Sequence, residues 1–157
     1  MNTANHAHPV LPNMPDSVVS YLKAGALGLV MTVGEDDYPT DAFSWVVATD
    51  ASTVRIGADH GSKTLGNLQR DGKVAVQIIG PDNLVYLIKG TSKRIKDDLE
   101  SVPMGIELWE VDVVGAKDQS WPGASPLPFS VQWSGDDREQ MIRTEQAAFS
   151  EMLQASA

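Results

Sequence analysis

Six runs of apolar and often β-branched residues follow one another along this chain of 157 residues, and most are joined by short, turn-like segments. Residues of this kind favour β-strands, and junctions rich in Gly, Asn and Asp favour tight turns. Parallel strands need a crossover of about a dozen or more residues, so these strands are predicted to pair mainly antiparallel. The expected strands cover residues 27–33, 42–49, 53–56, 73–79, 84–95 and 106–114.

Three helices are predicted beside the strands. Pro15 lies in the first turn of one helix and Gly25 lies beyond its end, as is common for these residues. Asp136 and Glu139 have the spacing of a capping box at the start of the last helix. The expected helices cover residues 15–24, 64–70 and 136–153.

These elements predict a mainly β fold with six or seven antiparallel strands. A small barrel or a sandwich is expected, because full closure removes exposed strand edges. The chain reads as a single domain over residues 13–157 that follows a flexible tail at residues 1–12. In the last strand, the face expected to join the core carries Glu107, Trp109, Val111 and Val113.

Composition excludes several classes of function. The chain has no cysteine, which excludes disulfides, thiolate metal sites and cysteine nucleophiles, and no metal site is predicted. Its formal net charge of -9 opposes binding to nucleic acid. No apolar run reaches the ~18 residues of a membrane span, and the first residues resemble no targeting signal. A cytoplasmic protein with no membrane partner is therefore expected.

The segment from Gly57 to Thr64 is the strongest functional signal. It follows a predicted strand and opens a predicted helix. The first turn of a helix leaves backbone N–H donors free and carries a partial positive charge. Ser62 and Lys63 add a hydroxyl group and an ammonium group at the same place. The segment therefore predicts a site for a phosphorylated ligand.

Other interpretations of this segment were compared with a phosphate site. A nucleotide-hydrolase P-loop needs a glycine where Ser62 stands, and it needs a parallel βαβ frame. His60 beside Asp59 suggests a catalytic pair, but adjacent loop residues rarely face each other, and no Gly-x-Ser-x-Gly motif is present. Ser62 and Lys63 can also simply cap a surface helix. The P-loop and the hydrolase are the weaker alternatives.

Several short motifs in order resemble those of a known family. They are Gly57, Ser62-Lys63, Asn67-Leu68, Gly72-Lys73-Val74-Ala75-Val76 and Ile88-Lys89-Gly90-Thr91. Over residues 15–117 the chain resembles the pyridoxamine 5'-phosphate oxidase-like, FMN-binding split β-barrel proteins. The resemblance implies a split β-barrel with a short inserted helix.

The resemblance also implies a function. It implies a homodimer that holds FMN in clefts between its subunits and acts as an oxidoreductase on a small substrate. It assigns the phosphate contacts to Ser62 and Lys63 and further polar contacts to Thr64 and Asn67. The residues implied to line the flavin ring are Ser44, Trp45, Ile56, Gly57 and Ala58. No catalytic side chain is identified.

One position departs from the family pattern. Many members that bind flavin have an arginine about three residues after a proline, and here Ala42 follows Pro39 at that distance. Arg55 or a residue of the other subunit could replace the missing charge. The departure keeps deazaflavin and heme open as alternative cofactors, and also a binding module without turnover. The basic residues typical of the biosynthetic oxidase near its C-terminus are missing, so that activity is not expected.

Overall fold

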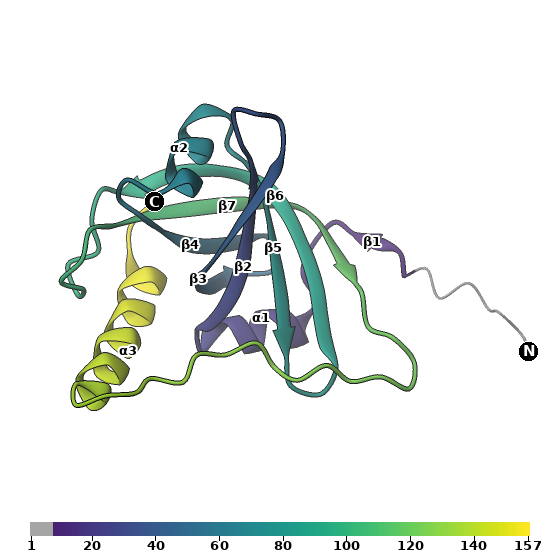
Figure 1. The fold of residues 1–157 in the computed structure, drawn as a ribbon. Coiled ribbons are helices and arrows are strands. Elements are labelled where there is room, and N and C mark those ends of the chain that lie inside the picture. Colours follow the sequence, from purple (N-terminus) through teal and green to yellow (C-terminus); the bar gives the residue numbers. More distant parts are fainter. Residues whose placement is uncertain (1–7) are drawn as a thin grey trace, which may run out of the picture.

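Six antiparallel strands form a closed barrel in the computed structural model, which describes residues 8–157 (Figure 1). Around the barrel the order is β7, β4, β3, β2, β5 and β6, and β6 pairs back with β7. The predicted mainly β, antiparallel barrel is confirmed. The strands are β2 (Ala26–Val33), β3 (Pro39–Asp50), β4 (Thr53–Asp59), β5 (Lys73–Gly80), β6 (Leu84–Lys96) and β7 (Ile106–Asp118).

The barrel closes through β6 and β7, which are the two longest strands. Their register shifts between Lys89 and Gly90 and again between Arg94 and Lys96. Such irregularities bend a strand, which helps β6 to follow the barrel wall. A Cβ atom at Gly90 would lie 2.3 Å from the carbonyl oxygen of Asp112. Closure at this point therefore requires glycine.

The interior of the barrel holds the main hydrophobic core. Trp109 and Val111 belong to this core and Val113 packs against it, so the face predicted for β7 is confirmed. Glu107 is also buried, and its Oε2 accepts a hydrogen bond of 2.9 Å from Trp109 Nε1. The strand residues of this core include Val30, Val46, Val54, Ile56, Val76, Ile78 and Ile88.

A second hydrophobic core lies outside the barrel, under helix α3 (Arg138–Gln154). Phe149 and Met152 of α3 pack there with Val47 of β3 and with Leu108 of β7. Ile106 joins the same cluster, so both faces of the first half of β7 are buried. The alternating pattern of β7 predicted only one buried face. The other face is also buried because α3, from the end of the chain, covers it.

Polar contacts fix α3 to the barrel at several points. Trp45 Nε1 donates to Glu145 Oε2 at 2.8 Å, and the ring of Trp45 meets Phe149 edge to face with centroids 6.2 Å apart. The predicted capping box is wrong: Asp137 is the N-cap of α3, and its side chain makes no capping hydrogen bond. Packing and the contacts with Trp45 therefore position this helix more than its N-cap does.

Two short N-terminal elements pack against the closed barrel. Helix α1 (Asp16–Lys23) buries Val18 and Leu22 in the main core, close to the predicted bounds. Val10 and Leu11 were predicted to belong to a flexible tail but form β1 (Val10–Leu11), which pairs with β7. Residues 1–7 of that predicted tail lie outside the described part of the chain.

The segment between β7 and α3 crosses the lower end of the barrel in Figure 1. It is tied down by a hydrogen bond of 2.9 Å from Phe129 N to Ile79 O and by an edge-to-face contact between Phe129 and Phe43. Trp121, in the same segment, is 68% exposed. Among the described helices, none combines the length and the apolar character that crossing a membrane requires.

Candidate functional site

The turn between β4 and helix α2 (Lys63–Arg70) contains the predicted phosphate-binding residues. Ser62 is the N-cap of α2, and its Oγ accepts a hydrogen bond of 3.1 Å from Leu65 N. Gly61 has a φ of +75°, which turns the chain into the helix. Within residues 8–157, no hydrogen-bond acceptor meets the backbone N–H of Lys63 or Thr64. The capped helix therefore keeps two donors for an anion.

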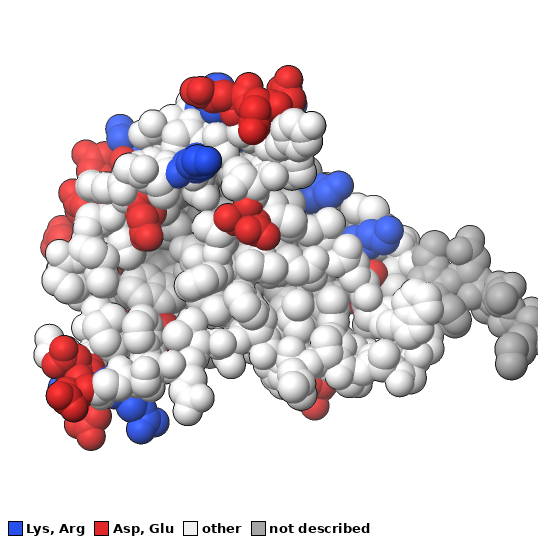
Figure 2. Space-filling model, viewed as in Figure 1, with Lys and Arg blue, Asp and Glu red and all other residues white. Residues whose placement is uncertain are grey.

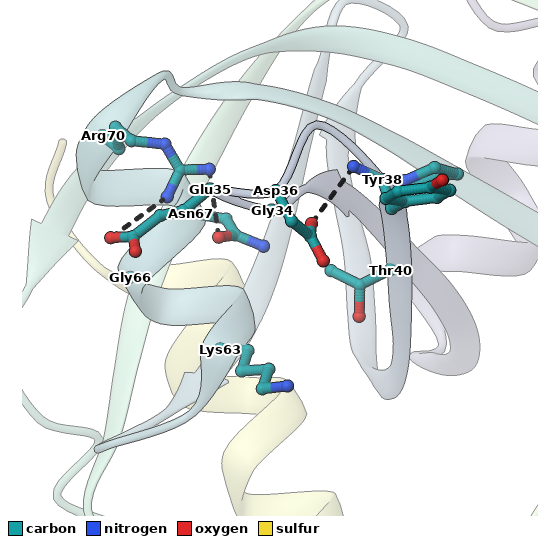
Figure 3. A pocket seen from close by; sticks show the side chains of 10 residues that line it. Gly34, Glu35, Asp36, Tyr38, Thr40, Lys63, Gly66, Asn67 and Arg70 are labelled. Atoms are coloured by element: carbon teal, nitrogen blue, oxygen red, sulfur yellow. Dashed lines mark hydrogen bonds and ion pairs between the residues drawn. The ribbon is translucent and has the colours of Figure 1, made fainter.

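A cavity of about 590 Å³ opens beside this turn, between α2 and the hairpin that joins β2 to β3. Figure 3 shows Lys63 pointing into the space between the two elements. Among the described residues, no ion pair or hydrogen bond engages its Nζ. Lys63 is thus a cation available to a ligand.

Asn67 and Arg70 lie on the same helix, but neighbouring residues already occupy their polar groups. The Nδ2 of Asn67 donates to Thr32 Oγ1 at 2.9 Å, and its Oδ1 accepts from Arg70 Nη2 at 3.1 Å. Arg70 also donates to the carbonyl oxygen of Val33 and faces Glu35 at 4.0 Å. Asn67 therefore joins α2 to β2 through its Nδ2, while its Oδ1 is occupied by Arg70 of the same helix.

The opposite wall of the cavity is acidic. Glu35 and Asp36 line it, and Figure 2 shows acidic side chains gathered over the apex of the hairpin. Sequence reasoning interpreted these residues as a solvated turn and did not place Arg70 at the site. Arg70 follows Lys63 by seven residues, which is two helical turns, so helical spacing was a usable signal for it. No comparable signal connected the hairpin to the helix.

A much smaller cavity of about 40 Å³ lies on the barrel side of the turn. A volume of this size holds about one water molecule, so one chain alone does not enclose a flavin ring there. The Oγ of Ser44 donates to Gly57 O at 2.7 Å. Five of the predicted site residues line the small cavity, together with Ala42 and Asp59: Ser44, Gly57, Ala58, Ser62 and Thr64.

The structure does not bring Trp45 and Ile56 to this group. Successive side chains of a strand point to opposite faces, so Trp45 lies on the other face of β3 from Ser44. There it packs against α3 and hydrogen-bonds to Glu145. Ile56 is fully buried inside the barrel. Neither residue lines the cavity of about 590 Å³ or the cavity of about 40 Å³.

Arg55 was a candidate to replace the charge missing at Ala42, and the structure corrects this. Its guanidinium is 2.9 Å from Glu110 Oε2 and donates to the carbonyl oxygens of Met152 and Ala155 at 2.7 and 2.8 Å. The side chains of the ion pair are 7% and 8% exposed. Arg55 therefore anchors the end of α3 and is not available to a ligand.

The residues present fit the phosphate group of a flavin nucleotide. Lys63 supplies a free ammonium beside two free N–H groups, and a Cβ atom added at Gly61 would meet nothing within 4 Å, so the turn is open to solvent. A phosphate group is held well by donors of this kind. The space for the ring is less complete, because the adjoining cavity is small.

Comparison with known proteins establishes the fold. The structure resembles an F420 reductase, with a TM-score of 0.58 and 19% identity over 68% of this chain and 100% of that one. It resembles a candidate pyridoxamine 5'-phosphate oxidase from Lactobacillus delbrueckii, with a TM-score of 0.58 and 15% identity over 70% and 98% of the two chains. It also resembles HupZ from Group A Streptococcus, with a TM-score of 0.56 and 16% identity over 73% of this chain and 99% of that one.

These proteins share one class of fold with this chain, the split β-barrel. The predicted resemblance to the pyridoxamine 5'-phosphate oxidase-like proteins is confirmed at the level of the fold. No protein-family model matches the chain, and no curated protein gives a significant match. Activity and cofactor are therefore argued from the site.

Proposed function

We propose that this protein binds FMN by its phosphate group at the start of α2 and acts as an oxidoreductase on a small substrate. The observation that supports this most is the unpaired ammonium of Lys63, beside two free N–H groups of the same helical turn. FMN, when bound, would supply the hydride or electron transfer. The role of the protein is to hold and orient the cofactor.

The proposal includes a homodimer with a cofactor site at each end of the subunit interface. On the barrel side of the phosphate turn, where most of the predicted ring-lining residues lie, one chain encloses only about 40 Å³, so a second surface is needed to cover the ring. Apolar residues are available for such an interface: Val33 is 47%, Phe43 is 65% and Val114 is 68% exposed. A mainly apolar cavity of about 410 Å³ lies between Val33 and Val114.

A binding module without turnover is the second candidate. Ala42 adds no charge beside the phosphate turn, and Arg55 is committed to Glu110. Both observations favour a weaker or different cofactor, such as a deazaflavin or heme. Likeness in fold to an F420 reductase supports the deazaflavin alternative. Residues Lys63 and Thr64 would hold the phosphate group of a deazaflavin in the same way.

Absorbance spectra and gel filtration test the proposal. The purified protein is mixed with FMN and run on a column that separates bound from free ligand. We expect one FMN per chain, eluting at the size of a dimer, with an absorption band that a nicotinamide donor bleaches. Retained FMN that no donor reduces would favour the binding module. Failure to retain FMN would contradict the proposal, and titration with a deazaflavin or heme would then follow.

The variant Lys63→Ala is expected to bind FMN about 10- to 100-fold more weakly than the wild type. A hydrogen bond to a charged group contributes about 1.5–3 kcal/mol, and this variant removes the only unpaired cation described at the turn. Lys63 is exposed, so the fold and the dimer should remain. Fluorescence titration measures the dissociation constant.

Lys23→Ala is the matched control for this variant. It removes the same charge from the last turn of α1, far in the chain from the site. The control should bind FMN as the wild type does. Equal affinities of Lys63→Ala and Lys23→Ala would refute the assignment of Lys63 to the phosphate.

A further inference from the structure

We propose that His60 is a positioning residue for the phosphate-binding turn. Its imidazole joins the turn to the loop between β6 and β7, and this contact keeps Gly61, Ser62 and Lys63 in the arrangement that meets a phosphate group. The inference rests on the proposed function, because it concerns the same site. It adds a residue that lies outside the cavity and that the family resemblance does not indicate.

Three contacts tie His60 to the β6–β7 loop. Its Nε2 lies 3.1 Å from the carbonyl oxygen of Asp97 and 3.2 Å from Oδ1 of Asp98, and its backbone N–H donates to Gly105 O at 3.0 Å. Both atoms near Nε2 are acceptors, so the tautomer with a proton on Nε2 can donate to either of them. The side chain is 47% exposed, so this contact itself adds little stability. Its effect is to fix where the turn lies.

Gly105 makes this contact possible. A Cβ atom at position 105 would lie 2.6 Å from Nδ1 of His60 and 2.9 Å from its Cγ. The imidazole ring therefore lies directly against the backbone of the β6–β7 loop. Any side chain at position 105 would displace the ring from Asp97 and Asp98.

The rest of the turn has few other restraints. A Cβ atom added at Gly61 would meet nothing within 4 Å, and Asp59, His60, Gly61 and Lys63 are all exposed. The Ser62 backbone N–H donates to Asp59 O at 3.1 Å, which holds the turn to itself and not to another element. Among the described side chains of the turn, His60 is the one that connects the turn to a separate loop.

The loop that receives His60 is itself well supported. Glu151 of α3 accepts hydrogen bonds of 2.7 and 2.8 Å from the backbone N–H groups of Glu100 and Ser101. Leu99 N donates to Ile106 O at 2.8 Å, and Leu99 is buried. A turn joined to this loop is held against a fixed part of the molecule.

The test compares FMN with riboflavin, which lacks the phosphate group. The ratio of the two affinities isolates the contribution of the phosphate site from that of the ring site. We expect His60→Ala to lower the FMN-to-riboflavin affinity ratio about three- to tenfold, the effect of about one hydrogen bond. His60→Gln, whose amide can still donate to the Asp97 carbonyl, should recover part of the ratio.

Gly105→Ala provides an independent variant that keeps the imidazole. It should lower the same ratio, because the new methyl group displaces the ring. Lys23→Ala, which lies on α1 and lines none of the cavities described above, serves again as the control. Thermal unfolding of each variant shows that the fold is kept.

The outcomes separate this inference from the proposed function. If the wild type prefers FMN to riboflavin and Lys63→Ala loses that preference, the phosphate site holds. An unchanged affinity ratio in both His60→Ala and Gly105→Ala would then overturn the positioning role alone. A wild type without preference for FMN would overturn the phosphate site and this inference together.

Discussion

Arg55→Met is expected to lower the free energy of unfolding by about 3–5 kcal/mol, because removing one partner of a buried ion pair leaves the other charge without compensation. Among residues 8–157, the carboxylate of Glu110 would keep only Lys93, at 3.5 Å, as an ion-pair partner. The carbonyl oxygens of Met152 and Ala155 would lose their donor. The free energy of unfolding of an ordinary protein is about 5–15 kcal/mol in total, so this substitution would remove a large part of it.

Urea unfolding followed by circular dichroism measures this loss, and Lys93→Met serves as its control. Lys93 also contacts Glu110, but its side chain is 59% exposed, so the control should lose less than about 1 kcal/mol. The slope of the unfolding transition should stay constant in both variants. Equal losses in the two variants would show that Arg55 does not anchor α3.

The second large effect concerns Glu151, the carboxylate through which α3 holds the β6–β7 loop. Burial raises its pKa, but hydrogen bonds from Lys96, Ser101 and the Glu100 backbone lower it further, to about 2 from the usual 4.5. Each pKa unit corresponds to about 1.4 kcal/mol, so ionised Glu151 contributes about 3 kcal/mol of stability. The variant Glu151→Gln should lose most of this free energy of unfolding at neutral pH.

The dependence on pH has a definite sign. A carboxylate with a depressed pKa in the folded state stabilises the protein above the unfolded pKa, and this stability is lost as the pH falls through the folded value. The difference between the wild type and Glu151→Gln should thus be constant above about pH 5 and shrink from pH 4.5 towards pH 2. Glu100→Gln, whose side chain is 84% exposed, should show little difference at any pH.

Local patterns predicted most of the fold. Alternation and turn residues located the six barrel strands, because each signal lies within a few neighbouring residues. The second core was missed, since Leu108 and Trp109 point to opposite faces and only contact with Phe149 shows why both are buried. The N-cap of α3 was misplaced by one residue, because Asp136 and Asp137 offer the same chemistry side by side.

The candidate site was predictable only where it is continuous in sequence. Ser62 as a cap and Lys63 in the first turn follow from the order of a strand, a turn and a helix. The hydrogen bond from Asn67 to Thr32 could not be predicted in this way, because the two residues are 35 apart in the chain. Arg55 illustrates the same limit: its partner Glu110 is 55 residues away, and an isolated arginine in a strand is open to many roles.

Docking of α3 also has a consequence for synthesis of the chain. The last strand of the barrel ends at Asp118, whereas Met152, which Arg55 holds, is made 97 residues after Arg55. At about 5–20 residues per second, a ribosome needs roughly a few seconds to add the remaining helix. During that interval the apolar side chains of Val47 and Leu108 have no cover. We expect a chain stalled before α3 to bind a chaperone, and a chain released after α3 to escape it.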